Sequence, residues 1–340
     1  MTSLATEHIP AARFAISIPQ TVADGSFDPA AMDTYLTEAE ELGFGSAWTG
    51  EQVLGTLPML GPLETLAYAA ARTRRIRLGC AMVVSALHNP VHLAKTIASV
   101  DQLSRGRLEI GLVTGGPARM FSAFGVEPAS FVARFGEGLR LMRQLWTQPR
   151  VDFDGRFWQL SNAAMEPKPF QEPHPPIWFG GNHPNALARA ARFAHGFLGA
   201  GSSTTAAFVQ HARIVREQLH EQQRDPGSFT IAKRVYIAVD NDAATARDRI
   251  ADALDHMYRY FGMGNLAAVA VAGTVDDCVA GLREVAAAGA QTILLNPLFD
   301  ELHQMRRLAT DVIPQLTSMY RSWPQAGREA TSKGNACPLT

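Results

Sequence analysis

The chain alternates short apolar runs with amphipathic stretches of helical period along most of its length. The clearest example is the segment Arg75 to Gly116, in which apolar runs at 76–84 and 108–113 flank a helical pattern at 90–103. Apolar positions repeating about every 3.6 residues predict a helix, and short continuous apolar runs predict strands that are buried on both faces. This segment therefore predicts one β-α-β unit, in which each strand ends in a loop of small residues.

The same alternation continues on both sides of this unit. We expect further strands at 13–18, 45–48, 176–179, 196–198, 229–239 and 292–296, and further helices at 30–42, 61–73, 131–146, 184–194, 204–223, 243–260, 275–288 and 301–319. Strands that alternate with helices at this spacing predict an α/β protein with a parallel sheet. About eight such repeats favour closure into a (β/α)8 TIM barrel, and a doubly wound open sheet with an extra domain is the alternative.

Residues 150–176 interrupt this alternation. Apolar and polar residues alternate around Asp154-Gly155, which is a strong hairpin signal, and prolines crowd the second half of the segment. We interpret the segment as an insertion outside the barrel repeat. No linker rich in Pro, Gly or Ser separates two halves, so we predict one domain over residues 1–320 and a disordered polar tail over 321–340.

Composition narrows the partners of the protein. The 340 residues are 46% hydrophobic and 19% charged, and the net charge of −1 predicts binding to neither nucleic acid nor an anionic membrane. No apolar run approaches the ~18 residues of a membrane span, and the first residues lack the apolar core of a signal peptide. Three widely separated cysteines, at 80, 278 and 337, favour a reducing compartment and no metal site. We therefore expect a cytoplasmic protein that acts on a small molecule.

The carboxyl ends of the strands are where a barrel of this kind carries its active site. The candidate residues at these ends are Glu51 and Gln52 after the second strand, His88 after the third, and Thr114, Gly115 and Gly116 after the fourth. Glu51 is a lone acid that would suit proton transfer or the orientation of a polar ring edge, and a solvated loop carboxylate is an equal alternative. His88 precedes Asn89-Pro90, so it also suits a simple turn into the next helix.

The best candidate anion site follows the fifth strand. Gly180, Gly181 and Asn182 lie where a strand passes into a helix, so their N–H groups would be free and the helix dipole would favour negative charge. The loop 199–203, which includes Gly201 and Ser202, should lie beside them because it follows the sixth strand. A tight turn alone would also explain the glycines, but the pairing of the two loops favours phosphate binding.

Several strings of the sequence occur together in one known family. They are Ala39 to Phe44 followed by Trp48 and Glu51, Arg75 to Gly79, Asn89-Pro90, Asp101 to Arg107, Phe153 to Trp158, and Pro173 to Gly181. In this order and spacing, from about Arg13 to about Gln315, the chain resembles the bacterial luciferase-like flavin-dependent oxidoreductases. These proteins form the luciferase-like monooxygenase superfamily.

The resemblance implies a barrel with an insertion and a flavin-type cofactor at the carboxyl face. The cofactor would be FMN, supplied reduced by a partner reductase, or the deazaflavin coenzyme F420. Cofactor contacts would fall on Glu51, Ala81, Met82, Thr114, Gly115, Gly116, Gly180, Gly181 and Asn182. In the F420-using branch the third strand often has a non-proline cis peptide under the ring, and its place here is around Ala81-Met82. Relatives are commonly homodimers, so we expect a homodimer.

Two departures from the family pattern bear on the chemistry. Many members have a histidine after the acid of the second strand, where this chain has Gln52, so one proton-transfer group is missing. The F420-dependent sugar-phosphate dehydrogenases have an acid where this chain has Gly116. Strands two to five look closer to the F420-using branch, so we slightly favour F420 over FMN. A non-redox barrel enzyme for a phosphorylated metabolite and a non-catalytic flavin binder stay open as alternatives.

Overall fold

A computed structural model describes residues 13–22, 26–115, 122–259 and 264–316. In these residues eight parallel strands close into a barrel, in which each strand pairs with the next and β11 pairs with both β9 and β1. The strands are β1 (Arg13–Ser17), β2 (Ser46–Thr49), β3 (Arg77–Val84), β4 (Leu108–Val113), β7 (Ile177–Gly180), β8 (Gly196–Gly199), β9 (Thr230–Val239) and β11 (Thr292–Asn296). The predicted (β/α)8 barrel is confirmed, and the open sheet is excluded.

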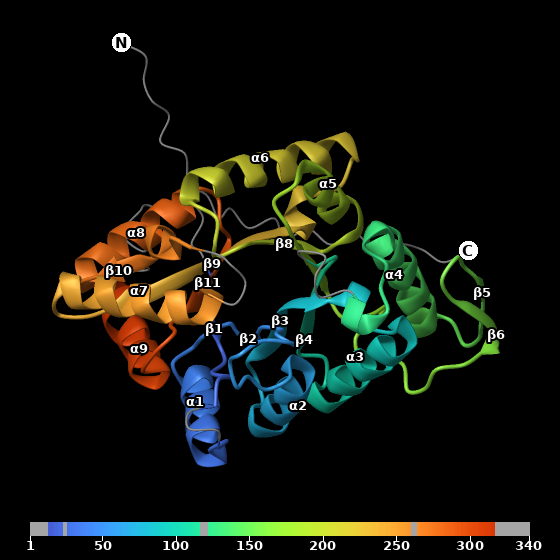
Figure 1. Ribbon diagram of the computed structural model, residues 1–340, viewed down its shortest axis with the longest axis horizontal. Coiled ribbons are helices and arrows are strands. Elements are labelled where there is room, and N and C mark those ends of the chain that lie inside the picture. Colours follow the sequence, from blue (N-terminus) through green and yellow to red (C-terminus); the bar gives the residue numbers. More distant parts are fainter. Residues whose placement is uncertain (1–12, 23–25, 116–121, 260–263, 317–340) are drawn as a thin grey trace, which may run out of the picture.

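The helices lie around the outside of the barrel, as Figure 1 shows. They are α1 (Pro29–Glu41), α2 (Pro62–Arg72), α3 (Pro90–Ser104), α4 (Phe131–Thr147), α5 (Pro184–Phe193), α6 (Thr205–Glu221), α7 (Ala243–Tyr258), α8 (Val275–Ala287) and α9 (Glu301–Arg307). Side-chain caps set several of the first turns. Asn89 accepts a hydrogen bond from the N–H of Val91 at the start of α3, and Thr274 and Asp277 form a capping box at the start of α8.

Two features lie outside the eight-stranded repeat. In the insertion, β5 (Val151–Asp154) and β6 (Gln159–Ala163) form a separate antiparallel hairpin, as the Asp154-Gly155 signal predicts. A short strand that the sequence did not predict, β10 (Val271–Gly273), pairs with the end of β9. Three residues are too few to show a period of two, which is why the pattern missed it.

The predicted last helix differs from the observed one. After α9 the backbone continues through a π-helical turn at Leu308–Val312 instead of a regular α-helix. Residues 317–319 of the predicted helix, Gly116 and the predicted tail at 321–340 lie outside the described residues.

Two buried carboxylates attach the insertion to the barrel helices. Glu137 on α4 accepts hydrogen bonds from the three successive N–H groups of residues 156–158. Asp101 on α3 accepts from both the backbone N–H and the side-chain amide of Gln171, each at 2.8 Å. A buried charge is tolerated when it is hydrogen-bonded in this way. These two acids therefore have a structural role and are not candidates for catalysis.

The barrel interior is closed by two tryptophans. The rings of Trp48 and Trp178 meet edge to face, with 5.6 Å between their centroids. They occupy the space that side chains of Gly79 and Gly196 would need, because a Cβ at either glycine would lie 2.4 Å from a ring carbon. Two residues after each tryptophan, where the next side chain would point into the barrel, the chain has a glycine, at Gly50 and Gly180. The missing side chains leave room above the tryptophans. Within the described part of the barrel interior, a ligand therefore has space at the carboxyl ends of the strands.

Candidate active site

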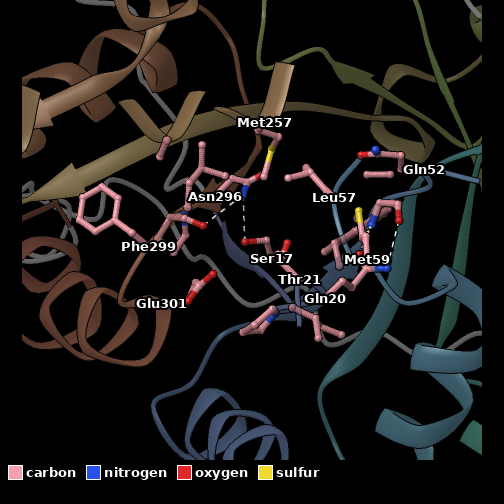
Figure 2. Close-up of a pocket in the computed structure, with 18 of the residues that line it drawn as sticks. Ser17, Gln20, Thr21, Gln52, Leu57, Met59, Met257, Asn296, Phe299 and Glu301 are labelled. Atoms are coloured by element: carbon pink, nitrogen blue, oxygen red, sulfur yellow. Dashed lines mark hydrogen bonds between the residues drawn. The ribbon is translucent and has the colours of Figure 1, made fainter. Parts of the chain in front are cut away.

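A cavity of about 630 Å³ opens at the carboxyl ends of the strands. Its wall comes from β1, β2, β3, β9 and β11, from the loops that follow β1, β2 and β11, and from α7. Figure 2 shows Ser17, Gln52, Met257, Asn296 and Phe299 around this space. The volume is in the range of small-molecule sites, and the location agrees with the general rule for barrel enzymes.

Glu51 and His88 come from different strand ends and form one hydrogen-bonded pair. Oε1 of Glu51 lies 2.7 Å from Nε2 of His88, and Oε2 accepts a hydrogen bond from the N–H of Val84 at 2.6 Å. The Glu51 side chain is 2% exposed, whereas that of His88 is 30% exposed. A buried carboxylate in this position orients the imidazole, whose exposed part can then exchange a proton beside the cavity that Glu51 lines. The sequence suggested both residues but not their pairing.

Gln52 follows Glu51 and also lines the cavity. Its Nε2 atom is buried, and no described residue accepts a hydrogen bond from it. It packs against the backbone at Gly55, where an added Cβ would lie 1.6 Å from it. Gln52 cannot take up or release a proton as a histidine would, but it can hold a carbonyl or ring oxygen.

The third strand departs from regular geometry beside the cavity. The Ala81–Met82 peptide bond is cis, at the position that the resemblance implies, and the register with β4 shifts between Cys80 and Val83. The neighbouring strand accommodates this bulge at Gly111. A Cβ there would lie 2.2 Å from both the Cys80 carbonyl oxygen and the Met82 sulfur. The absence of a side chain at Gly111 is therefore what lets β3 present Ala81 to the cavity.

The turn after β4 is built from small residues. Gly115 has a φ of +107°, a conformation that residues with a side chain rarely adopt, and Thr114 before it is half-buried. Because β4 pairs with both β3 and β7, this turn lies between the Ala81–Met82 bulge and the exit of β7.

The exits of β7 and β8 present unpaired N–H groups side by side. Gly180 is in register with Leu198, so the loops that follow the two strands are neighbours, as the sequence predicts. No described residue accepts a hydrogen bond from the backbone N–H groups of 181–183 or 201–202. Gly181 has a φ of +139°, and α5 begins shortly after it. Free amides at a helix start are a suitable cradle for a phosphate.

Lys233 supports the second of these loops from behind, and the sequence did not suggest it. Its Nζ donates hydrogen bonds to the carbonyl oxygens of Ala200, Ser203 and Arg234. The residue is 3% exposed, and burial, together with the neighbouring Arg234, lowers its pKa to about 7. The two adjacent basic residues, Lys233 and Arg234, within the mostly apolar strand β9 were the available signal.

The buried Lys233 gives a prediction for stability against pH. The folded protein releases this proton near pH 7, whereas the unfolded chain holds it to about pH 10.4. The unfolded state therefore binds more protons between these values, and the free energy of unfolding should rise with pH across this interval. Urea unfolding at several pH values measures the rise, with Lys233→Met as the variant that lacks this proton. Equal pH slopes for the two proteins would contradict the prediction.

The fold and the site define a class: a (β/α)8 barrel protein with a bulged third strand and a cradle of free amides at its carboxyl face. Residues 12–292 match the family model described as luciferase-like monooxygenase, so the chain belongs to that family. A crystal structure of a monooxygenase from Streptomyces bottropensis superposes with a TM-score of 0.78 at 26% identity, over 89% of this chain and 99% of that one.

Curated relatives use two kinds of cofactor. The oxygenase component of a flavin-dependent trigonelline monooxygenase from Acinetobacter baylyi is 27% identical over 66% of this chain and 62% of its own length. An F420-dependent glucose-6-phosphate dehydrogenase from Kineococcus radiotolerans is 30% identical over 65% of this chain and 67% of its own length. The match to the first of these therefore spans less than two thirds of that relative.

Two features are absent from the described residues. These residues contain no helix that is both long and apolar enough to span a membrane. They also contain no group of three or more His, Cys, Asp or Glu side chains placed to hold a metal ion.

Proposed function

We propose that this protein is an oxidoreductase that binds a flavin-type cofactor across the barrel mouth and acts on a small organic substrate in the adjoining cavity. The observation that carries the proposal is the pair of loops after β7 and β8, whose N–H groups at 181–183 and 201–202 have no acceptor among the described residues. FMN and F420 both carry a phosphate that such a cradle fits. The flavin and F420 enzymes among its relatives support the same assignment.

The residues around the mouth fit a flat ring system. Free amides at 181–183 and 201–202 would hold the phosphate, and the turn at Thr114 and Gly115 would allow the chain of the cofactor to approach the backbone. Ala81 and Met82 would lie against the ring, and Gln52, which also lines the cavity, would turn its side-chain amide to a ring oxygen. Once bound, the cofactor supplies hydride or oxygen chemistry, while the protein supplies orientation and excludes water.

The Glu51–His88 pair would move protons for this chemistry. His88 is partly exposed at the mouth, so its ring can exchange a proton with substrate or solvent. Glu51, which is held by the N–H of Val84, would fix the orientation of the ring. Gln52, at the family's usual histidine position, would then act as a hydrogen-bond donor only.

The cofactor itself is proposed as F420, slightly favoured, or FMN. If the cofactor is FMN, a separate flavin reductase would be a partner, as the name "oxygenase component" of one relative suggests. We also propose that the protein acts as a cytoplasmic homodimer.

Separate titrations with FMN and F420 test the proposal. We expect one of them to bind one equivalent per chain, with its phosphate-free analogue (riboflavin, or the deazaflavin chromophore alone) at least about tenfold weaker, because charge-assisted hydrogen bonds to phosphate are lost. Fluorescence of the ring measures both affinities. Failure of both cofactors to bind would favour a non-redox enzyme for a phosphorylated metabolite. Binding without turnover of any substrate would favour a non-catalytic flavin binder.

A further inference from the structure

Arg234 on β9 brings a positive charge to the cavity without an acidic partner. Its guanidinium lines the cavity, and no described carboxylate forms an ion pair with it. Nε donates to Oδ1 of Asn296 at 2.6 Å, and Nη1 makes a long contact of 3.5 Å to the carbonyl oxygen of Ala81. No described residue accepts a hydrogen bond from Nη2. A guanidinium at this depth is costly unless an anion completes its hydrogen bonds.

A chain of side chains holds this guanidinium in position. Nδ2 of Asn296 donates to Oγ of Ser17 at 3.2 Å and to the carbonyl oxygen of Pro297 at 3.3 Å, and Figure 2 shows both bonds. These two donations orient the amide so that its oxygen faces Arg234. The arginine also lies 5.8 Å from the centroid of the Tyr236 ring. The terminal nitrogens of Arg234 are therefore held toward the cavity before any ligand arrives.

The acids that line the same cavity are not available as counterions. Glu51 is already engaged by Val84 and His88. Burial raises the pKa of Glu301 at the start of α9, and none of the hydrogen bonds of Arg234 goes to its carboxylate. His256 on α7, which also lines the cavity, adds no negative charge.

The side chains that hold this guanidinium lie away from the first half of the phosphate cradle, at 181–183. Arg234 itself stands on β9, which pairs with β8, so its strand is next to the second half at 201–202. In the order of the eight strands, β1 lies opposite β7, and β11 lies opposite β4. Ser17 and Asn296 therefore stand across the mouth from the free amides at 181–183. Apolar side chains, among them Leu57, Met257 and Phe299, line the cavity on the Ser17 and Asn296 side (Figure 2).

We propose that Arg234, aimed by Asn296, binds a carboxylate or an equivalent anionic oxygen group of the substrate. The substrate class is then an organic acid with an apolar or aromatic body, which packs against Leu57, Met257 and Phe299. This assignment rests on the proposed function for its reaction, but the binding of the acid does not require the cofactor.

Matched pairs of an acid and its neutral amide test the assignment. The probes are benzoate against benzamide and hexanoate against hexanamide, titrated by calorimetry into the protein with and without cofactor. We expect the better acid to bind roughly 10- to 100-fold more tightly than its amide. This preference for the acid should disappear in Arg234→Met. It should be kept in part in Arg234→Lys, which retains the charge but lacks the planar guanidinium that can bind both carboxylate oxygens. Asn296→Asp, which supplies an internal counterion, should also abolish it.

A control and two contrary results complete the experiment. Arg213→Met removes an exposed arginine that pairs with Glu217 on α6, and it should leave the preference for acids unchanged. The assignment is wrong if acids bind no tighter than amides to the unaltered protein. It is also wrong if Arg234→Met weakens the cofactor and leaves acid binding intact. Acid binding in a protein that takes up neither cofactor would support this site and contradict the proposed function.

Discussion

Replacing Gly111 with alanine is expected to lower the free energy of unfolding by about 1–3 kcal/mol and to weaken cofactor binding at least tenfold. The new Cβ would lie 2.2 Å from the carbonyl oxygen of Cys80, which is backbone and cannot move aside by a rotamer change. Relief requires a shift of β3, and that shift displaces Ala81 and Met82, the residues proposed to lie against the cofactor ring. Urea unfolding and cofactor titration measure the two effects.

Gly136 provides a matched control for this substitution. It is exposed within α4, and nothing lies within 4 Å of an added Cβ. Alanine there should raise stability by up to about 1 kcal/mol, because alanine favours the helix more than glycine does. It should leave cofactor binding unchanged. If Gly111→Ala binds cofactor as tightly as Gly136→Ala, β3 does not carry the ring.

Replacing Glu51 with glutamine is expected to reduce turnover by about 10²- to 10⁴-fold while cofactor affinity changes little. The amide keeps the size of the side chain and can still accept from the N–H of Val84. It has one carbonyl oxygen in place of the two carboxylate oxygens that bind Val84 and His88, so the imidazole loses its hydrogen bond to a carboxylate and its fixed orientation. Steady-state rates with a substrate found by screening the cofactor-loaded protein measure the loss.

A double-mutant cycle tests whether Glu51 and His88 act together in catalysis or independently. If Glu51 and His88 act as a unit, the double variant Glu51→Gln with His88→Gln should be no slower than the slower single variant. Glu64→Gln, which changes an exposed glutamate of α2, is the matched control and should retain full activity. Losses that multiply in the double variant would show that the two residues act separately.

Much of the barrel could be predicted because its elements depend on local patterns. Continuous apolar runs at 76–84 and 108–113 and the helical spacing at 90–103 reflect burial on two faces and on one face, respectively. The observed strands β3 and β4 and helix α3 lie within a residue or so of those bounds. The short β10 could not be predicted this way, because three residues are too few to show a period.

The sequence predicted which strand ends carry the residues of the candidate site. It did not predict which of these residues contact one another. The barrel rule alone selected Glu51, His88 and the loop at 180–182. It did not select Lys233 or the pairing of Arg234 with Asn296, because inward and outward positions on a strand look alike in sequence when both are buried.

The sequence alone determined the family resemblance, the number and order of the barrel strands, and the end of the barrel where a ligand has room. Each of these properties depends on short local patterns of residues, so it can be predicted from one segment of the chain at a time. Only the tertiary structure decided that Glu51 meets His88, that Arg234 faces the cavity without an acid, and that Gly111 makes space for β3. Each of these depends on the closing of the barrel, which brings together side chains from strands that are far apart along the chain.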